Sequence, residues 1–108
     1  MYKRIIASGD LVMPEGTRIY AVRLESTSDD CYAIIYDAVT AALGATNSNQ
    51  ICTLFVTNIV GDGDTGIGTQ DIHPNSDKQS FGPIGITMER GISVTLNGTT
   101  PKLYIYYA

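Results

Sequence analysis

Hydrophobic side chains alternate with polar or small ones along most of this chain. This period of two is typical of β-strands that bury one face. The pattern is clearest over residues 17–26, which follow a Pro-Glu-Gly turn at 14–16 and are predicted to form one strand. In that strand the inward positions are expected to be Tyr20, Val22 and Leu24, and the outward positions Ala21, Arg23 and Glu25.

The same alternation predicts further strands at residues 2–8, 11–13, 31–37 and 51–58. Segment 31–37 is apolar on both faces, so we expect it to lie centrally in a sheet. Residues 81–108 predict three more short antiparallel strands, joined by tight hairpin turns at 89–91 and 97–100. Their alternating positions are Ile84, Ile86 and Met88, then Ile92, Val94 and Leu96, and finally Leu103, Ile105 and Tyr107.

Two segments depart from the strand pattern. Asp37 is predicted to cap one or two helical turns over residues 38–43 that end at Gly44, and the alternative is an irregular excursion. Residues 59–80 have a glycine or turn residue at nearly every other position, which predicts a long loop before Phe81 re-enters the sheet. The chain is therefore expected to be an all-β, single-domain antiparallel sandwich or jelly roll of about eight strands over residues 1–108.

Composition supports a folded domain and narrows the range of partners. Of the 108 residues, 44% are hydrophobic and only 17% are charged, which is unlike a disordered chain. The net charge is −4 and the seven Lys and Arg residues form no basic stripe, so we expect no nucleic-acid partner. No apolar run is long enough for a membrane span or a secretory signal, and we expect a soluble protein that is made in the cytoplasm.

Cys31 and Cys52 both fall within predicted strands. Two cysteines without an export signal do not indicate a disulfide framework, so we expect free, buried thiols. The alternative is that the two strands are neighbours and that the pair oxidises in the isolated protein.

Residues for catalysis are scarce. His73 is the only histidine, and it lies in the predicted loop, where it is expected to face solvent or to pack. No nucleophile with a base and no pair of tuned carboxylates is evident, so we expect no enzyme activity and no cofactor.

The segment Asp62-Gly-Asp-Thr-Gly resembles the start of a calcium loop. The positions that should supply a third ligand, a glycine and a bidentate carboxylate are occupied by Gly66, Ile67 and His73. We therefore expect an ordinary turn and no metal, with an unconventional Ca²⁺ site made by Asp62, Asp64 and Asp71 as the alternative.

The seven tyrosines are expected to fill the core or to line a protein interface. Tyr104 and Tyr106 share one face of the last predicted strand, opposite Leu103 and Ile105. A strand that is apolar on both faces is expected to be covered on one side by the second sheet and on the other by another subunit.

Several segments together resemble small jelly-roll proteins among the virion components of tailed phages, namely the decoration or cement proteins on the outside of the capsid. The resemblance covers most of the chain except residues 38–50 and 59–80. It is carried by Ala-Ser-Gly at 7–9, Pro-Glu-Gly at 14–16 followed by residues 19–26, Ile-Tyr-Asp at 35–37, and residues 81–86 and 91–94.

This resemblance implies a homotrimer that binds the major capsid protein on the outer surface of an icosahedral head and stabilises contacts between capsid subunits. Two segments are candidates for the contact: residues 1–4, which contain the only adjacent basic pair, and the loop 59–80. The candidate capsid or oligomer interface residues are Tyr2, Lys3, Arg4, Ile67, Ile72, His73, Phe81, Tyr104 and Tyr106.

The alternative function is a phage tail or fibre protein, or a carbohydrate-binding β-sandwich module. Such a module would use the same fold and bind sugar through Tyr106, or through Ca²⁺ held by Asp62 and Asp64.

Overall fold

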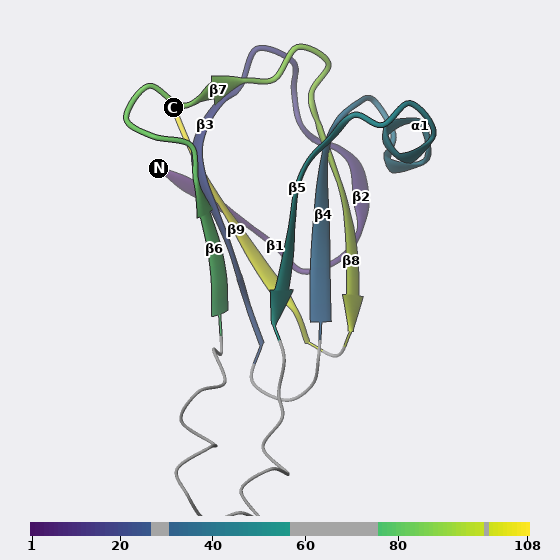
Figure 1. Cartoon of the computed structure of the whole chain (residues 1–108), viewed down its shortest axis with the longest axis vertical. Helices are drawn as coiled ribbons and strands as arrows, with labels where there is room; N and C mark the ends of the chain where they lie inside the picture. The colour runs from purple at the N-terminus through teal and green to yellow at the C-terminus, as the bar shows by residue number, and fades with distance from the viewer. Residues whose placement is uncertain (27–30, 57–75, 99) are drawn as a thin grey trace, which may run out of the picture.

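The computed structural model describes residues 1–26, 31–56, 76–98 and 100–108 of the chain. Two antiparallel sheets pack face to face as a sandwich, which confirms the predicted all-β fold (Figure 1). Sheet A has the order β1 (Tyr2–Ile5), β9 (Lys102–Tyr107), β3 (Arg18–Glu25) and β6 (Ser76–Ser80), and β7 (Ile86–Thr87) pairs with the start of β3. Sheet B has the order β2 (Gly9–Met13), β8 (Ile92–Gly98), β4 (Cys31–Asp37) and β5 (Gln50–Val56).

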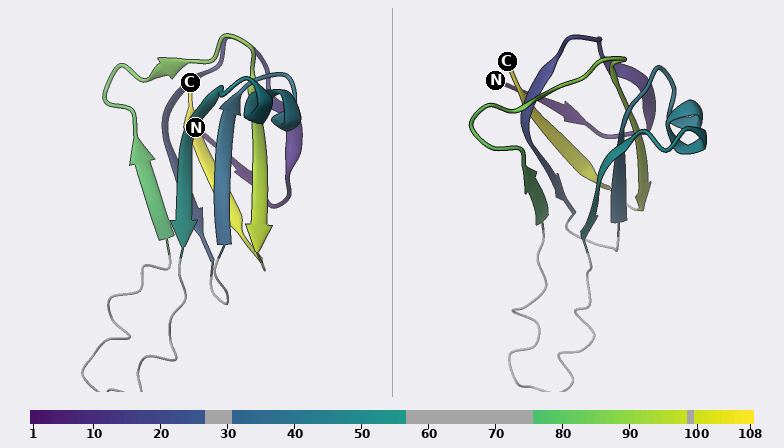
Figure 2. Two further views of the ribbon diagram at one scale, coloured as in Figure 1. Left: turned by 45° about the vertical axis from the view of Figure 1, so that its right-hand side comes forward. Right: turned by 45° about the horizontal axis from the view of Figure 1, so that its top comes forward.

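The pairing of the eight longer strands is nested. β4 pairs with β5, β3 with β6, β2 with β8 and β1 with β9, all antiparallel. The chain thus forms one long hairpin of nested strand pairs, with β4 and β5 innermost and β1 and β9 outermost. This hairpin is folded so that successive pairs lie alternately in sheet B and sheet A (Figure 2). This is the topology of a jelly roll, which was one of the two predicted forms.

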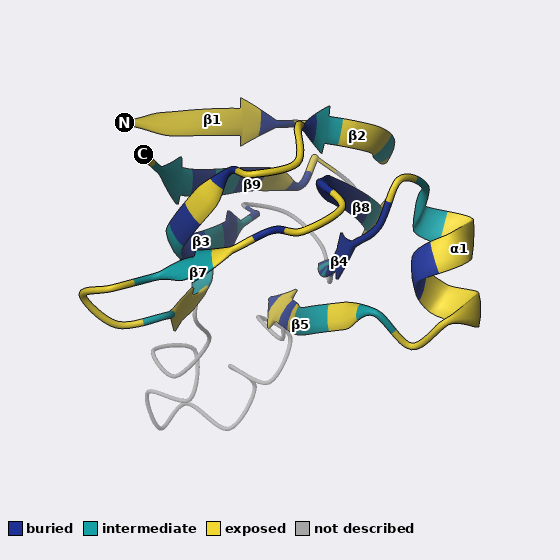
Figure 3. Ribbon diagram, turned by 90° about the horizontal axis from the view of Figure 1, so that it is seen from above, coloured by how far each residue is buried: buried dark blue, intermediate teal, exposed yellow. Residues whose placement is uncertain are grey.

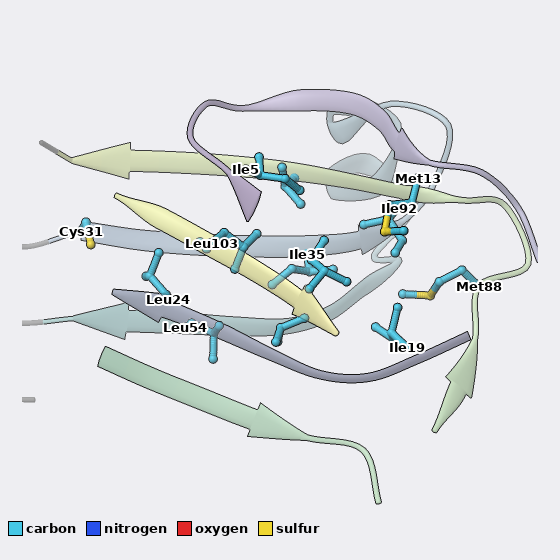
Figure 4. Close-up of a cluster of buried hydrophobic side chains, with 14 of the residues drawn as sticks. Ile5, Met13, Ile19, Leu24, Cys31, Ile35, Leu54, Met88, Ile92 and Leu103 are labelled. Atoms are coloured by element: carbon cyan, nitrogen blue, oxygen red, sulfur yellow. The ribbon is translucent and has the colours of Figure 1, made fainter. Parts of the chain in front are cut away.

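The core lies between the sheets. Large aliphatic side chains from both layers are fully buried there, and each contributes about 1.5–3 kcal/mol by leaving water (Figure 4). β4 lies centrally in sheet B, between β8 and β5, as its apolar sequence predicted. The buried side chains labelled in Figure 4 are Ile5, Met13, Ile19, Leu24, Cys31, Ile35, Leu54, Met88, Ile92 and Leu103.

One inward position of β3 was predicted wrongly. Ile19 is fully buried, whereas Tyr20 is only half-buried. The register between β3 and β9 shifts between Ile19 and Ala21, so an extra residue interrupts the strict alternation there. Val22 and Leu24 do face the core, as expected.

The last strands are not joined as hairpins. β8 pairs with β2 and β4 in sheet B, whereas β9 pairs with β1 and β3 in sheet A. The turn between them therefore carries the chain from one sheet to the other. The predicted strand around residues 84–88 is reduced to the two residues of β7, and Ile84 is 73% exposed.

Part of the predicted long loop is a strand. β6 is made of residues that are polar at every position, so no hydrophobic alternation marks it, yet it pairs with β3 at the edge of sheet A. The backbone N–H of Phe81 then donates to the carbonyl of Tyr20. The rest of the predicted loop, residues 59–75, lies outside the described residues.

The helix is α1 (Ala41–Thr46), and its cap differs from the prediction. The side chain of Thr40 caps it by accepting from the N–H of Leu43, and Asn47 ends it. Gly44 is a buried position inside the helix, where an added Cβ would lie 2.6 Å from side-chain carbons of Tyr36. Asp37 instead accepts hydrogen bonds from the backbone N–H groups of Glu89 and Arg90, at 3.2 and 2.7 Å.

Cys31 and Cys52 are not joined by a disulfide. Cys31 is buried as predicted, whereas Cys52 is only partly buried. β4 and β5 are neighbours, but Cys31 lies opposite Val56 and Cys52 opposite Ile35. That offset is about 13 Å along the strand, too far for a disulfide, so the alternative of an oxidised pair is wrong.

Candidate functional site

The part of the chain that the structure describes contains no pocket and no group of three or more metal-ligating side chains. Among the same residues no helix has the length and apolarity that a membrane span requires. We therefore looked for a site on the two outer faces of the sandwich, where strand register fixes which side chains lie together.

The outer face of sheet A gathers tyrosines and basic residues from four of its five strands, namely β1, β9, β3 and β6. Residues that are paired directly in antiparallel strands point to the same face. One row across the sheet is Arg4, Tyr104, Arg23 and Lys78, and the row beside it is Tyr2, Tyr106, Ala21 and Ser80. A third row contains Lys102, Glu25 and Ser76.

We name this surface the Tyr–Arg face. It comprises Tyr2, Arg4, Arg23, Glu25, Lys78, Lys102, Tyr104 and Tyr106. β1, which forms one side of it, is exposed along most of its length, as Figure 3 shows.

The three tyrosines form a cluster. The ring of Tyr2 lies 5.7 Å from that of Tyr104 and 6.0 Å from that of Tyr106, with tilted planes in both pairs. These are favourable separations for aromatic pairs. Tyr2 is 60% exposed, so the cluster presents aromatic surface to solvent.

Arg23 is held at the centre of the face by three contacts. Its Nη1 forms an ion pair with Oε2 of Glu25 at 2.6 Å, and its Nε donates to Oη of Tyr106 at 3.4 Å. Its Cζ lies 4.6 Å from the centre of the Tyr104 ring. Tyr104 Oη in turn donates to the other oxygen of Glu25 at 3.2 Å, which closes a ring of contacts.

The hydrogen bond with Tyr106 and, after it, the interactions with Glu25 raise the pKa of Arg23 above its usual value. The guanidinium is therefore a permanent cation with a defined orientation.

The face concentrates positive charge in an acidic protein. It contains four of the seven Lys and Arg residues but only one of the six acidic residues that the structure describes. The outer face of sheet B is different, since the outward positions paired across β8, β4 and β5 carry no charged side chain. Those positions include Tyr32, Ile34, Thr53, Phe55, Thr95 and Asn97.

The structure brings four of the predicted interface residues together: Tyr2, Arg4, Tyr104 and Tyr106. Lys3 lies on β1 but is not part of this face, because its Nζ donates to the carbonyl of Val12 on β2. Phe81 is partly buried and packs against the core, so it is not an exposed contact residue. Ile67, Ile72 and His73, and the calcium candidates Asp62, Asp64 and Asp71, lie outside the described residues.

Four members of the face were not predicted as interface residues, namely Arg23, Glu25, Lys78 and Lys102. Arg23 was correctly expected to point outward, but nothing local indicated that it would meet Tyr104 and Tyr106 from another strand. Lys102 immediately precedes the tyrosines and could have been found by its alternation with Tyr104. Lys78 lay in a segment that we expected to be a loop.

The inward face of the last strand packs against the core, as predicted, although Tyr107 is only partly buried there. Leu103 and Ile105 are completely buried against sheet B, whereas Tyr104 and Tyr106 are only half-buried. The expected cover by another subunit would lie over these two tyrosines, and so over the centre of the Tyr–Arg face.

In comparisons with protein-family models, with curated proteins and with solved structures, no match to this chain was found.

Proposed function

We propose that this protein is a structural binding protein of a phage virion, a decoration protein that docks on the outer surface of an icosahedral head and stabilises contacts between major capsid subunits. The observation that carries the proposal is the Tyr–Arg face, where one exposed and two half-buried tyrosines cluster around Arg23 on the outside of a jelly roll. The proposal assigns no catalytic role and no cofactor to the chain.

Tyrosine and arginine are the residue types that, with tryptophan, dominate the binding energy of protein interfaces. Here they are carried by paired strands and not by loops. Tyr104 and Tyr106 lie on β9, which is paired on both sides, and the contacts of Arg23 with Glu25 and Tyr104 fix its rotamer before any partner arrives. A pre-ordered surface loses less side-chain entropy on docking.

A homotrimer is part of the proposal. A trimer presents the same face three times, and three weak contacts with a repetitive shell give a much slower dissociation than one. Light scattering on the purified protein measures this directly, since a trimer has three times the 11.6 kDa mass of the chain.

The function is tested by sedimentation with bare phage heads that are assembled from a major capsid protein alone. Wild-type protein is expected to co-sediment to saturation and to raise the temperature at which the heads break. Tyr106→Ala is expected to lower occupancy at least tenfold, as for the loss of an interface hot spot. Tyr32→Ala is the matched control, because Tyr32 is also a half-buried outward tyrosine on a central strand, but of sheet B.

A tyrosine cluster is also compatible with a carbohydrate-binding module. The ring planes are inclined by 59° in one pair and 48° in the other, so the rings do not form one flat platform for a sugar ring. This geometry favours a protein partner. Saturable binding on a glycan array together with no binding to heads would reverse that preference.

A further inference from the structure

We propose that the partner surface that docks on the Tyr–Arg face is an acidic protein surface. This inference rests on the proposed function and specifies the chemistry of the partner at the same site.

The charge of the chain is divided between this face and the rest. The face carries four basic side chains and one acidic one, whereas the other described residues carry three basic and five acidic ones. A protein that is negative overall is repelled by a negative partner unless it presents a positive surface. The face supplies that surface and so determines which side of the sandwich approaches an acidic partner.

Three of the four cations have no carboxylate partner within the described part of the chain. Arg23 forms the one ion pair found there, with Glu25, and these two charges largely compensate each other. Arg4, Lys78 and Lys102 are exposed and take no part in an ion pair among the described residues. They are the positive charges that remain available to a partner.

These three cations lie on three different strands beside the aromatic centre. Arg4 is on β1 and Lys78 on β6, at opposite ends of the row that contains Tyr104 and Arg23. With strands about 4.8 Å apart, the ends of this row are separated by about 14 Å. Lys102 lies two residues before Tyr104 on β9. An aromatic centre with a charged rim is the anatomy of a specific protein interface.

A continuous polyanion fits the face less well than a protein with discrete carboxylates. Arg4, Arg23 and Lys78 share one row, but Tyr104 lies between the first two. Glu25 also lies within the face, where it is paired with Arg23. A row of phosphates or sulfates crossing it would meet that carboxylate. An acidic protein surface can place its carboxylates opposite the rim and leave Glu25 bonded to Arg23 and Tyr104.

The test compares Arg4→Gln/Lys78→Gln with Ala42→Glu/Ala45→Glu. Both double variants make the net charge more negative by two, but the second places its change on exposed positions of α1, which packs beside sheet B. We expect the first variant to slow association with bare heads about tenfold at low salt and to flatten its dependence on salt. We expect the α1 variant to retain the wild-type salt dependence.

If wild-type protein binds heads and both variants associate equally fast, the inference is overturned and the proposed function stands. If wild-type protein does not bind heads, the proposed function fails, and NMR titration with poly-L-glutamate still tests the inference. The inference is supported if the chemical-shift changes are confined to β1, β6 and β9 and become smaller in the Arg4→Gln/Lys78→Gln variant. No binding of poly-L-glutamate, or tighter binding of heparin at the same face, overturns it.

Discussion

The carboxylate of Asp77 accepts a hydrogen bond from the backbone N–H of Phe55 at 3.0 Å, and this bond joins the two sheets. Asp77 is on β6, the edge of sheet A, and Phe55 is on β5, the edge of sheet B, and these edges lie side by side (Figure 2). On the other side of the sandwich, Lys3 Nζ on β1 donates to the carbonyl of Val12 on β2. At each side of the sandwich a charged side chain thus joins the edge strands of the two sheets. It forms a hydrogen bond with a backbone group to which a strand of another chain could otherwise bind.

Asp77→Ala is expected to uncover the edge of β5. Because the bonded N–H is near the surface and water can replace the carboxylate, the free energy of unfolding in urea should fall by only about 1 kcal/mol. The larger effect should be faster aggregation at high protein concentration, measured by light scattering. Asp77→Asn keeps an acceptor oxygen and should aggregate at close to the wild-type rate, and equal aggregation by both variants would contradict this role.

Asp37→Ala is expected to destabilise the fold by about 3 kcal/mol, because a buried carboxylate that accepts two backbone N–H groups would be lost. The turn after Met88 would lose its attachment to the end of β4. Urea denaturation measures the change, with Asp37→Asn expected to retain part of the stability. A loss below about 0.5 kcal/mol for the alanine variant would show that water satisfies the two N–H groups.

Gly44→Ala places helix propensity and packing in opposition. Alanine stabilises a helix interior by about 1 kcal/mol relative to glycine. At this position, however, the new Cβ would lie 2.6 Å from the Cβ of Tyr36, which is itself buried. We expect a net destabilisation of about 1–3 kcal/mol in thermal or urea unfolding. Ala45→Gly, at an exposed helix position, isolates the propensity effect, and a Gly44→Ala variant more stable than wild type would contradict the packing argument.

Burial, and after it the negative charge of Asp77, raises the pKa of Cys52 to about 11 from its usual 9.0. We therefore expect iodoacetamide at pH 8 to alkylate Cys52 much more slowly in the folded protein than in urea, as followed by peptide mass mapping. Rapid labelling of the folded protein would contradict this.

The same shift predicts how stability depends on pH. The folded protein holds the thiol proton more tightly than the unfolded chain does. The resulting stabilisation is complete below about pH 9 and is lost as the pH rises through about 11. Wild type should therefore lose more stability than Cys52→Ala over that interval, and parallel curves for the two proteins would contradict the prediction.

The sequence by itself determined the class of the fold and the direction of many side chains. Alternation is a local property, since adjacent residues in a strand point to opposite faces whatever the strand pairs with. This is why the central position of β4, the inward positions Val22 and Leu24 and the outward position of Arg23 followed from the pattern.

The tertiary structure alone decided how the strands are partnered. β8 and β9 are consecutive yet lie in different sheets, and β6 has no hydrophobic residue to mark it. Because the register shifts at Tyr20, Ile19 is buried in the core and Tyr20 is not. Tyr2 and Tyr106 come from opposite ends of the chain and meet only because β1 pairs with β9. Tyr106 reaches Arg23 because β3 pairs with β9 as well. Pairing and register depend on the free energy of packing the whole sandwich, which no short stretch of residues contains.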